Sequence, residues 1–461
     1  MIIIGAGSTG TNAAGYLLHQ GLSCVIVEGE LVGGSCSYWA CIPSKALLAA
    51  PAALAGARRL PGSAAAATGS LDAAAVFGRR DELVKHRDDS SQADWLASAG
   101  ATLLRGHARL RGVKQVQVDR ADGSTVGLTA ERAVVIATGS TPMVPPVDGL
   151  AEARSWTNRE ATEAEHAPDR LAIIGGGVVG CELGQAFARL GSHVTIVERA
   201  DRILAAYPPW VSEIVAAAFA DDGIEVRCAV GVDRVKRHDE SGPITLHVGD
   251  AEIEADEVLV ATGRRPATDD IGLDHVDLGD SAGDYLTVDA LLRVAGAPDN
   301  LGGSGWLYAV GDVNGRALLT HQGKYEARCV ADTIAGRPTP AIADEGVVPQ
   351  AVFTDPPVAS VGVNSATADR DLHEIVTVRA DSVAAASLAA DGRGGAEMVI
   401  DREKNTVVGA TFACHSADEL LHAATIAIVC GITVDDLWHC VPAFPTMSEL
   451  WLRLLEAHRG I

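Results

Sequence analysis

Two stretches of the 461-residue chain repeat one pattern, and this repetition constrains the fold more than any other feature. The first reads MIIIGAGSTGTNAAGYLLHQGLSCVIVEGE and the second reads LAIIGGGVVGCELGQAFARLGSHVTIVERA. In each, a short apolar run (residues 2–4 or 171–174) leads into a GxGxxG turn. A helical stretch follows, and a second β-branched run ends at Glu28 or Glu198. The pattern predicts strand, glycine turn, helix and strand, twice.

This βαβ pattern is typical of dinucleotide binding. The glycines allow a tight turn and let a pyrophosphate approach a helix N-terminus, and the closing acid binds a ribose. One GxGxxG alone is weak evidence, but two copies, each closed by an acid near the expected spacing, predict two bound dinucleotides. The residues are Gly5, Gly7, Gly10 and Glu28 in the first copy and Gly175, Gly177, Gly180 and Glu198 in the second.

Three later strands are predicted from motifs. VVIATGSTPMVPP and VLVATGRRPATDD are β-branched runs that end in Ala-Thr-Gly, and we interpret them as strands where the chain leaves each nucleotide domain. GWLYAVGDVNG predicts a strand ending near Asp312, a suitable position to bind a hydroxylated chain such as ribitol; an Asx-type turn is the alternative. Shorter alternating runs such as MVIDREKNTVVGATF predict antiparallel strands in a third, α+β domain.

Charge and composition narrow the function classes. A net charge of −23 argues against nucleic acid and anionic membrane surfaces as partners. The apolar runs look too interrupted to span a bilayer, and the chain starts on a strand rather than a signal peptide, so we expect a cytoplasmic protein with no membrane partner. Nine cysteines in this length do not form a disulfide scaffold, and no cysteine or histidine spacing predicts a metal site.

The stretch GGSCSYWACIPSK places Cys36 and Cys41 close together. On a regular helix they would lie about 7.5 Å apart along the axis and about 140° around it. A disulfide needs converging Cβ vectors and Cα atoms within about 7 Å. The pair therefore closes only in a loop or a distorted helix start, which Pro43 favours. We expect Cys41 at or just before a helix N-terminus, where thiol pKa values fall.

Together these motifs resemble the class I pyridine nucleotide–disulfide oxidoreductases, the family of dihydrolipoyl dehydrogenase, glutathione reductase, mercuric reductase and soluble transhydrogenase. The resemblance covers nearly the whole chain, in the order GAGSTG, GGxCxxxxCIPSK, ATGS, GGGVVGCELG, ATGRRP, YAVGDV, VFTDPPVASVG and FPTMSE. It implies an α/β fold of two Rossmann-like dinucleotide-binding domains plus a C-terminal α+β dimerisation domain, and a homodimer. The expected domains are residues 1–148 (FAD-binding, first part), 149–268 (NAD(P)-binding), 269–340 (FAD-binding, return part) and 341–461 (interface).

The resemblance also implies the cofactors. FAD is expected on the first fingerprint, with Glu28 on its adenosine ribose and Asp312 on its ribityl chain, and NAD(P)H on the second. The acid Glu198 favours NADH because it would repel a 2′-phosphate, although Arg199 and Arg202 nearby leave NADPH open. Further implied positions are Gly34, Ser35, Thr138 and Gly139 for FAD and Gly263 for NAD(P).

The resemblance assigns the electron path as well. Lys45 is expected beside the flavin N5 and paired with Glu182. Cys41 is then the charge-transfer thiol next to the flavin, and Cys36 is the interchange thiol that meets the substrate.

The chain departs from the family at one position. Disulfide-reducing members end in His-Pro-Thr-x-x-Glu, in which the histidine is the general acid–base. Here the segment reads PAFPTMSELW, so Phe444 stands at the histidine position while Glu449 remains. Glu449 is a candidate catalytic residue, with a purely structural role as the alternative. A phenyl ring carries no proton. His439 or Cys440 just upstream are possible substitutes.

Three functions follow. The first is FAD-dependent transfer from NAD(P)H through a redox-active Cys36–Cys41 disulfide to a dithiol or disulfide acceptor, as in dihydrolipoyl dehydrogenase. The second is transfer to a quinone, dye or second nicotinamide, as in soluble transhydrogenase. The third is a non-enzymatic flavoprotein redox sensor. Mercuric reductase is disfavoured because the chain shows no C-terminal cysteine pair. In each enzymatic case the acceptor is a small molecule.

Overall fold

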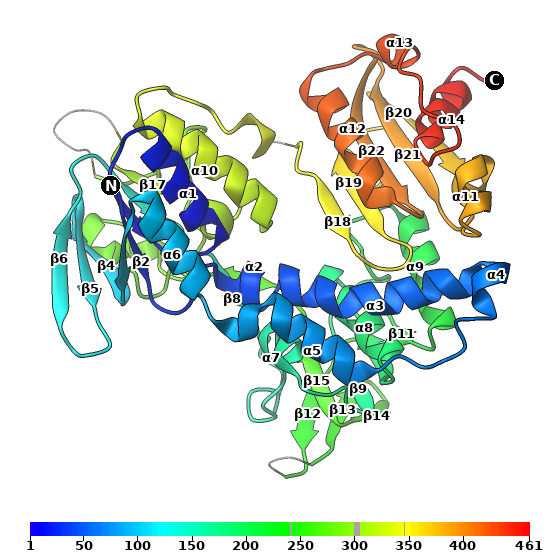
Figure 1. The fold of residues 1–461 in the computed structure, drawn as a ribbon, viewed down its shortest axis with the longest axis horizontal. Helices are drawn as coiled ribbons and strands as arrows, with labels where there is room; N and C mark the ends of the chain where they lie inside the picture. Colours follow the sequence, from blue (N-terminus) through cyan, green and yellow to red (C-terminus); the bar gives the residue numbers. More distant parts are fainter. Residues whose placement is uncertain (240–241, 299–304, 345) are drawn as a thin grey trace. The chain divides into compact units, whose positions relative to one another are not determined.

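The computed structural model describes residues 1–239, 242–298, 305–344 and 346–461. It divides into two compact units. Figure 1 draws the chain as a ribbon coloured along the sequence. Unit 1 comprises Met1–Pro43, Asp81–Met143 and Gly263–Glu345, and unit 2 comprises Ser44–Arg80, Val144–Thr262 and Gly346–Ile461. Each unit gathers segments that are far apart in the sequence, so the four predicted domain boundaries stay predictions.

Unit 1 is built on a parallel five-stranded sheet in the order β17-β7-β1-β2-β3. The strands are β1 (Ile2–Ile4), β2 (Val25–Glu28), β3 (Thr102–Arg105), β7 (Val134–Ile136) and β17 (Leu307–Ala309). Ile3 packs among helix side chains, whereas Ile2 and Ile4 pack in a second cluster on the opposite face. Both faces of the sheet are therefore covered, which explains the unbroken apolar run at the start of the sequence.

The helices of unit 1 flank this sheet. They are α1 (Ser8–His19), α2 (Gly34–Tyr38), α6 (Ser90–Ala99) and α10 (Thr320–Ile334), with short 3₁₀ turns η1 (Lys85–Arg87), η2 (Leu273–Val276), η3 (Gly279–Ser281), η4 (Gly311–Asn314) and η5 (Ile342–Asp344). An antiparallel sheet of β4 (His107–Gly112), β5 (Gln115–Asp119) and β6 (Thr125–Thr129) contributes to the cluster on the opposite face. A two-stranded sheet pairs β8 (Ser140–Pro142) with β16 (Arg264–Pro266).

Unit 2 repeats the nucleotide-binding frame. Its parallel sheet has the order β11-β10-β9-β15. The strands are β9 (Arg170–Ile174), β10 (His193–Val197), β11 (Glu225–Arg227) and β15 (Glu257–Val260), accompanied by α7 (Asn158–Glu163), α8 (Val178–Arg189), α9 (Pro209–Asp221) and an antiparallel sheet of β12 (Arg234–Arg237), β13 (Ile244–Val248) and β14 (Ala251–Ala255). The two predicted strand–turn–helix–strand units are confirmed.

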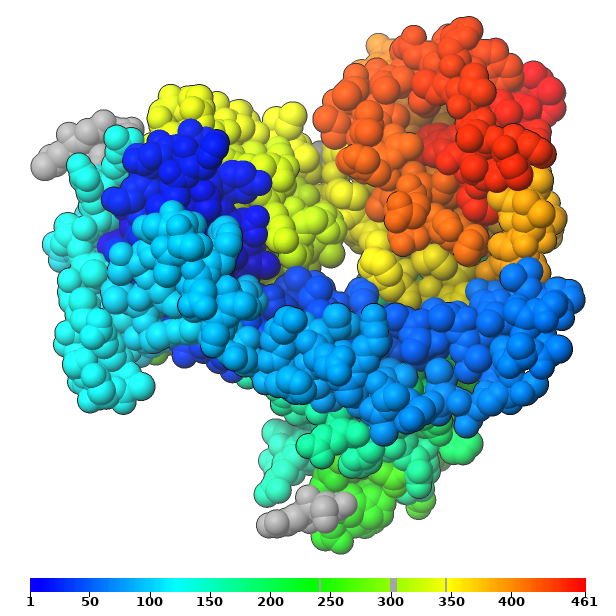
Figure 2. Space-filling view, viewed as in Figure 1, coloured from blue at the N-terminus to red at the C-terminus, as the bar shows by residue number. Residues whose placement is uncertain are grey.

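The C-terminal part of unit 2 is the predicted α+β layer. Its antiparallel sheet runs β18-β19-β22-β21-β20, with strands β18 (Gln350–Val352), β19 (Val358–Gly362), β20 (His373–Arg379), β21 (Gly395–Asp401) and β22 (Thr406–Ala413). Helices α11 (Ala384–Leu388), α12 (Ala417–Val429), α13 (Val434–Leu437) and α14 (Glu449–His458) and the turn η6 (Ala380–Ser382) complete it. In the space-filling view its last residues form a continuous orange-to-red body (Figure 2).

Helix α3 (Cys41–Arg59) carries the predicted reactive residues, and α4 (Pro61–Ala64) and α5 (Ala73–Leu83) follow it. The stretch Gly34–Arg59 is long and apolar enough to cross a membrane by length and composition alone, whereas the sequence analysis expected no run of that kind. The core helix of a soluble protein passes the same test. Leu47 and Leu48 of α3 pack in the core with Phe187 of α8, so this apolar character has a packing role within unit 2.

Candidate active site

Cys36 and Cys41 lie on two successive helices rather than on one. Cys36 is in α2 and Cys41 is the first residue of α3, with the helical path interrupted between them. This is the distorted helix start that the disulfide geometry required. Both cysteines are half-buried, and a hydrogen bond joins their side chains. The two sulfurs are therefore close enough to exchange a proton.

The surroundings of this thiol pair decide where its proton resides. The hydrogen bond with Cys41 raises the pKa of the Cys36 thiol well above its ordinary value, and burial adds to the rise. Thr320 and Lys324 act in the opposite direction. The thiol of Cys36 therefore holds the proton, while Cys41 stands at the N-terminus of α3, where the helix dipole favours a negative charge. The division of roles between the two thiols stays a prediction.

Lys45 forms an ion pair with Glu182, as the resemblance implied. Lys45 Nζ lies 2.6 Å from Glu182 Oε2, and the Glu182 side chain is only 4% exposed. The other carboxylate oxygen accepts the backbone N–H of Phe353 at 2.9 Å. The Lys45 ammonium also lies 4.9 Å from the centre of the Phe353 ring. Lys45 is thus held in one orientation by a carboxylate and an aromatic ring.

The first glycine turn has the geometry of a phosphate cradle. A Cβ on Gly10 would lie 2.0 Å from the Gly5 carbonyl oxygen, so α1 approaches β1 only because residue 10 is glycine. A Cβ on Gly7 would meet nothing within 4 Å, and Gly7 caps α1 without a side-chain hydrogen bond. The open space therefore faces N–H groups that the helix leaves unsatisfied. A backbone bridge also joins Gly7 to Gly33.

The second glycine turn repeats these features. A Cβ on Gly180 would lie 2.0 Å from the Gly175 carbonyl oxygen, and Gly177 again has open space and caps α8 without a side-chain bond. The closing acids are equivalent too. Glu28 Oε2 accepts the N–H of Ala6 at 2.7 Å, and Glu198 Oε2 accepts the N–H of Gly176 at 2.6 Å.

Several polar groups of unit 1 fit a flavin dinucleotide. Thr138 Oγ1, at the end of β7, is buried without a hydrogen-bond partner. Asp312 lies in η4 just after β17, where its Oδ2 accepts the Ser140 hydroxyl at 2.5 Å and stands 3.9 Å from Arg264 Nε. The open cradle offers backbone N–H donors to a pyrophosphate. The orphaned hydroxyl and the carboxylate at the strand ends offer hydrogen-bonding groups to a polyhydroxyl chain.

The structure also gives the local surroundings of the remaining predicted cofactor residues. Gly34 approaches Gly7, since a Cβ on it would lie 2.9 Å from the Gly7 Cα. Ser35 follows it in α2 and is exposed, Gly139 precedes β8, and Gly263 precedes β16 with its carbonyl accepting the N–H of Met143 at 3.0 Å. Their contacts with cofactors stay predictions.

Phe444, where the resemblance led us to expect a histidine, is exposed. The Phe444 side chain is 75% exposed, and His439 and Cys440 lie a few residues upstream of it, Cys440 exposed as well. Glu449, the first residue of α14, is 6% exposed, and its Oε2 is buried without a hydrogen-bond partner. Sequence reasoning did not predict this orphaned oxygen, and the role of Glu449 stays a prediction.

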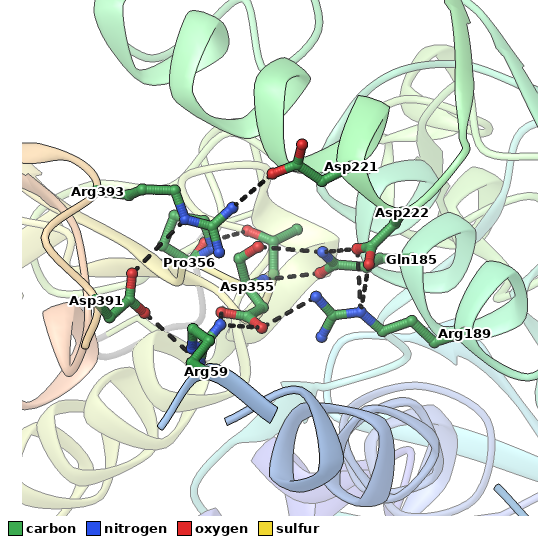
Figure 3. A network of polar contacts seen from close by, with 10 residues as sticks. Arg59, Gln185, Arg189, Asp221, Asp222, Asp355, Pro356, Asp391 and Arg393 are labelled. Atoms are coloured by element: carbon green, nitrogen blue, oxygen red, sulfur yellow. Dashed lines mark hydrogen bonds and ion pairs between the residues drawn. The ribbon is translucent and has the colours of Figure 1, made fainter. Parts of the chain in front are cut away.

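An ionic network anchors the far end of α3 (Figure 3). Arg59 lies 2.9 Å from Asp355 and 3.5 Å from Asp391, and Arg189 of α8 lies 3.0 Å from Asp355. Burial raises the pKa of Asp355, but the guanidinium groups of Arg189 and Arg59 outweigh burial and lower it. Helix α3 is therefore fixed to both the nucleotide-binding and C-terminal parts of unit 2.

Sequence reasoning missed three residues that contact the site. Thr320 Oγ1 lies 3.4 Å from Cys41 Sγ, Arg264 Nε donates to Ser140 Oγ at 2.6 Å, and Phe353 packs on Lys45. Each comes from a segment far along the chain from its partner, so no local motif points to it. Among the described residues no cluster of His, Cys, Asp and Glu is arranged to hold a metal ion.

Two dinucleotide frames and a close thiol pair define a flavin- and nicotinamide-dependent oxidoreductase. The family model for pyridine nucleotide-disulphide oxidoreductase matches residues 1–331, and the model for the dimerisation domain of these enzymes matches residues 348–454. The chain therefore belongs to the pyridine nucleotide-disulphide oxidoreductases and is an FAD-dependent enzyme of that family with a Cys36–Cys41 pair.

The relatives include both mercuric reductases and dihydrolipoyl dehydrogenases. The chain is 33% identical to a mercuric reductase of Streptomyces lividans and 33% identical to a dihydrolipoyl dehydrogenase of Chlorobaculum tepidum, covering 97% of this chain and 94% of each relative. Two solved structures share the fold at 24% identity. LpdA from Mycobacterium tuberculosis has a TM-score of 0.86, covering 100% of this chain and 99% of that one. The HOCl-induced flavoprotein disulfide reductase RclA from Escherichia coli has a TM-score of 0.84, covering 99% of both chains.

Proposed function

We propose that the enzyme takes electrons from NAD(P)H and passes them through the Cys36–Cys41 pair to a dithiol or disulfide acceptor of small size. The observation that carries this proposal is the hydrogen-bonded thiol pair, with the Cys36 proton retained and Cys41 at a helix N-terminus. Two thiols in contact are one oxidation step from a disulfide. FAD, when bound, supplies the two-electron exchange between nicotinamide and sulfur.

Each cofactor has a proposed set of residues. FAD uses Gly5, Gly7, Gly10, Glu28, Gly34, Ser35, Thr138, Gly139 and Asp312, and NAD(P)H uses Gly175, Gly177, Gly180, Glu198 and Gly263. NADH is the proposed nicotinamide because the Glu198 carboxylate stands at the strand end that meets the ribose. The C-terminal layer is proposed to form a homodimer, and the cytoplasm is the proposed compartment.

The exposed Phe444 supports a second candidate function. Transfer to a quinone, a dye or a second nicotinamide needs no general acid–base at the thiols, so phenylalanine would not impair it. The two candidates differ in their dependence on Cys36.

A panel of acceptors tests both proposals. The wild-type enzyme and Cys36→Ser are compared with NADH and NADPH, using lipoamide, a small linear disulfide, a quinone and a nicotinamide analogue. Under the first proposal lipoamide or the disulfide is reduced by the wild type and not by Cys36→Ser. Equal quinone turnover by both proteins, with no disulfide turnover by either, would establish the second candidate instead.

A further inference from the structure

Helix α10 lies directly against the turn η4, which carries Asp312. A Cβ on Gly323 of α10 would lie 3.2 Å from the Gly311 Cα and 2.2 Å from Thr9 Oγ1. A Cβ on Gly311 would in turn lie 2.8 Å from the same Thr9 oxygen. The start of α1, the turn η4 and α10 therefore meet this closely only because residues 311 and 323 are glycine.

One buried acid of α10 holds this turn. Glu326 is 0% exposed, and its Oε2 accepts the backbone N–H of Gly311 at 2.5 Å and the side-chain amide of Asn314 at 2.9 Å. Gly311 and Asn314 are the first and last residues of η4. A single oxygen atom of Glu326 thus ties both ends of the turn to α10, and Asp312 lies between the two tied residues.

The charges around Glu326 favour its neutral form. Arg316, two residues after η4, lies 3.0 Å from the Asp344 carboxylate, whose side chain is 0% exposed, and Gln322 donates to that same carboxylate. Burial and the charge of Asp344 raise the pKa of Glu326 above its ordinary value, although the bonds from Asn314 and Gly311 lower it. A neutral carboxyl group needs no cation as a partner. Glu326 can therefore act inside the fold as a plain hydrogen-bond acceptor.

The orientation of Asp312 depends on the shape of η4. The turn has four residues, so a shift at either end moves the residue between them. A carboxylate binds a hydroxyl group well only within a narrow range of distance and angle. Holding such a carboxylate in one orientation before the ligand arrives raises affinity, because less ordering is then needed on binding.

We propose that Glu326 is a positioning residue for FAD, which fixes turn η4 so that the Asp312 carboxylate is held in place for the ribityl chain. This inference rests on the assignment of Asp312 to FAD in the proposed function. The Oε2 of Glu326 is occupied by two donors of the turn, so Glu326 acts through Asp312 and not on the cofactor itself.

The test is a double-mutant cycle on FAD release from the holoenzyme. Release after dilution is followed by the rise in flavin fluorescence for wild type, Glu326→Leu, Asp312→Ala and the double variant. Two hydrogen bonds of ordinary strength set the scale, so Glu326→Leu should speed release about tenfold. In the Asp312→Ala background it should speed release less than about threefold, because the residue that it positions is gone. An equal factor in both backgrounds would show a purely structural role and overturn the proposal.

Conservative and control variants sharpen the cycle. Glu326→Gln keeps an oxygen acceptor on a side chain of the same length, so its release rate should stay within about threefold of wild type. A rate as fast as that of Glu326→Leu would contradict the role of this acceptor. Asp332→Leu is the matched control, since this acid of α10 accepts the Gln20 amide at 2.9 Å instead of a donor from η4. Its effect should be the same with and without the Asp312 carboxylate.

A second variant covers the case in which Glu326→Leu does not fold. Asn314→Ala removes one of the two donors and should speed release about threefold. It takes the place of Glu326→Leu in the cycle, and the same loss of effect in the Asp312→Ala background is expected. Equal factors in the two backgrounds would again overturn the proposal.

The outcomes separate failure of this inference from failure of the proposed function. Wild-type protein that retains no FAD would overturn the proposed function. Asp312→Ala protein that releases FAD as slowly as wild type would overturn the assignment of Asp312, and with it the role of Glu326. Electron transfer through Cys36 and Cys41 would then still be decided by the panel of acceptors.

Discussion

Replacing Lys45 by methionine isolates the contribution of the buried ion pair. Lys45→Met keeps most of the side-chain volume but leaves the Glu182 carboxylate, 4% exposed, with the Phe353 N–H as its other hydrogen-bond donor. Breaking a fully buried pair costs about 3–5 kcal/mol. The Lys45 side chain is 35% exposed, so water partly replaces it. A hydrogen bond to a charged group is worth about 1.5–3 kcal/mol. We expect a loss of about 2 kcal/mol, in the lower part of that range.

A double-mutant cycle checks this value. Urea unfolding is followed by far-ultraviolet circular dichroism for wild type, Lys45→Met, Glu182→Gln and the double variant. A loss of about 2 kcal/mol lowers the folded-to-unfolded ratio about thirtyfold. Because Glu182→Gln removes the unpaired charge, the double variant should recover at least about 1 kcal/mol relative to additivity. Additive losses, or a Lys45→Met protein as stable as wild type, would refute the reasoning.

Three further predictions concern other parts of the molecule. Phe444→His should raise disulfide turnover at least about tenfold, toward the roughly 10²–10⁴-fold typical of general acid–base catalysis. Stability should stay unchanged because the side chain at this position is 75% exposed. An unaltered rate in a steady-state lipoamide assay would contradict this prediction. The lowered pKa of Asp355 contributes stability above its unfolded pKa of about 3.9, and this stability is lost as the pH falls below that value. Asp355→Asn should therefore flatten the fall of the urea midpoint between about pH 5 and about pH 3, and a curve as steep as wild type would argue against it. Gly10→Ala should abolish FAD retention because its Cβ would lie 2.0 Å from a backbone oxygen. Gly7→Ala, whose Cβ would meet nothing within 4 Å, should fold and bind FAD more weakly than wild type. Equal flavin content in the two proteins would exclude this account.

Local signals in the sequence predicted the two nucleotide-binding frames well. The spacing of Gly5, Gly7 and Gly10 reflects contacts within one strand–turn–helix unit, so the reason for each glycine lies a few residues away. The break between α2 and α3 was also predictable, because two cysteines five positions apart cannot form a disulfide on a regular helix.

The polar surroundings of the site were not predictable in the same way. Thr320 is 279 positions from Cys41, and the Phe353 amide is 171 positions from Glu182. The Thr320 hydroxyl and the Phe353 amide meet their partners only because separate segments fold together, and neither position belongs to a pattern that distinguishes a site residue from an ordinary one. The pairing of Lys45 with Glu182 was expected only through family resemblance.

The duplicated frame has a consequence for how tightly each dinucleotide is held. The clash distances at Gly10 and Gly180 are equal, and the acids Glu28 and Glu198 engage equivalent amides, so the shared scaffold cannot distinguish a resident cofactor from a visiting one. Any difference in how tightly the two dinucleotides are held must therefore come from the residues that surround each frame. The bridge between Gly7 and Gly33 closes the first turn with a second strand of backbone, and in the part of the chain that the structure describes Gly177 has no such bridge. We expect this additional backbone contact to help the first frame retain its dinucleotide, while the second frame, which has no equivalent contact, exchanges its dinucleotide more readily.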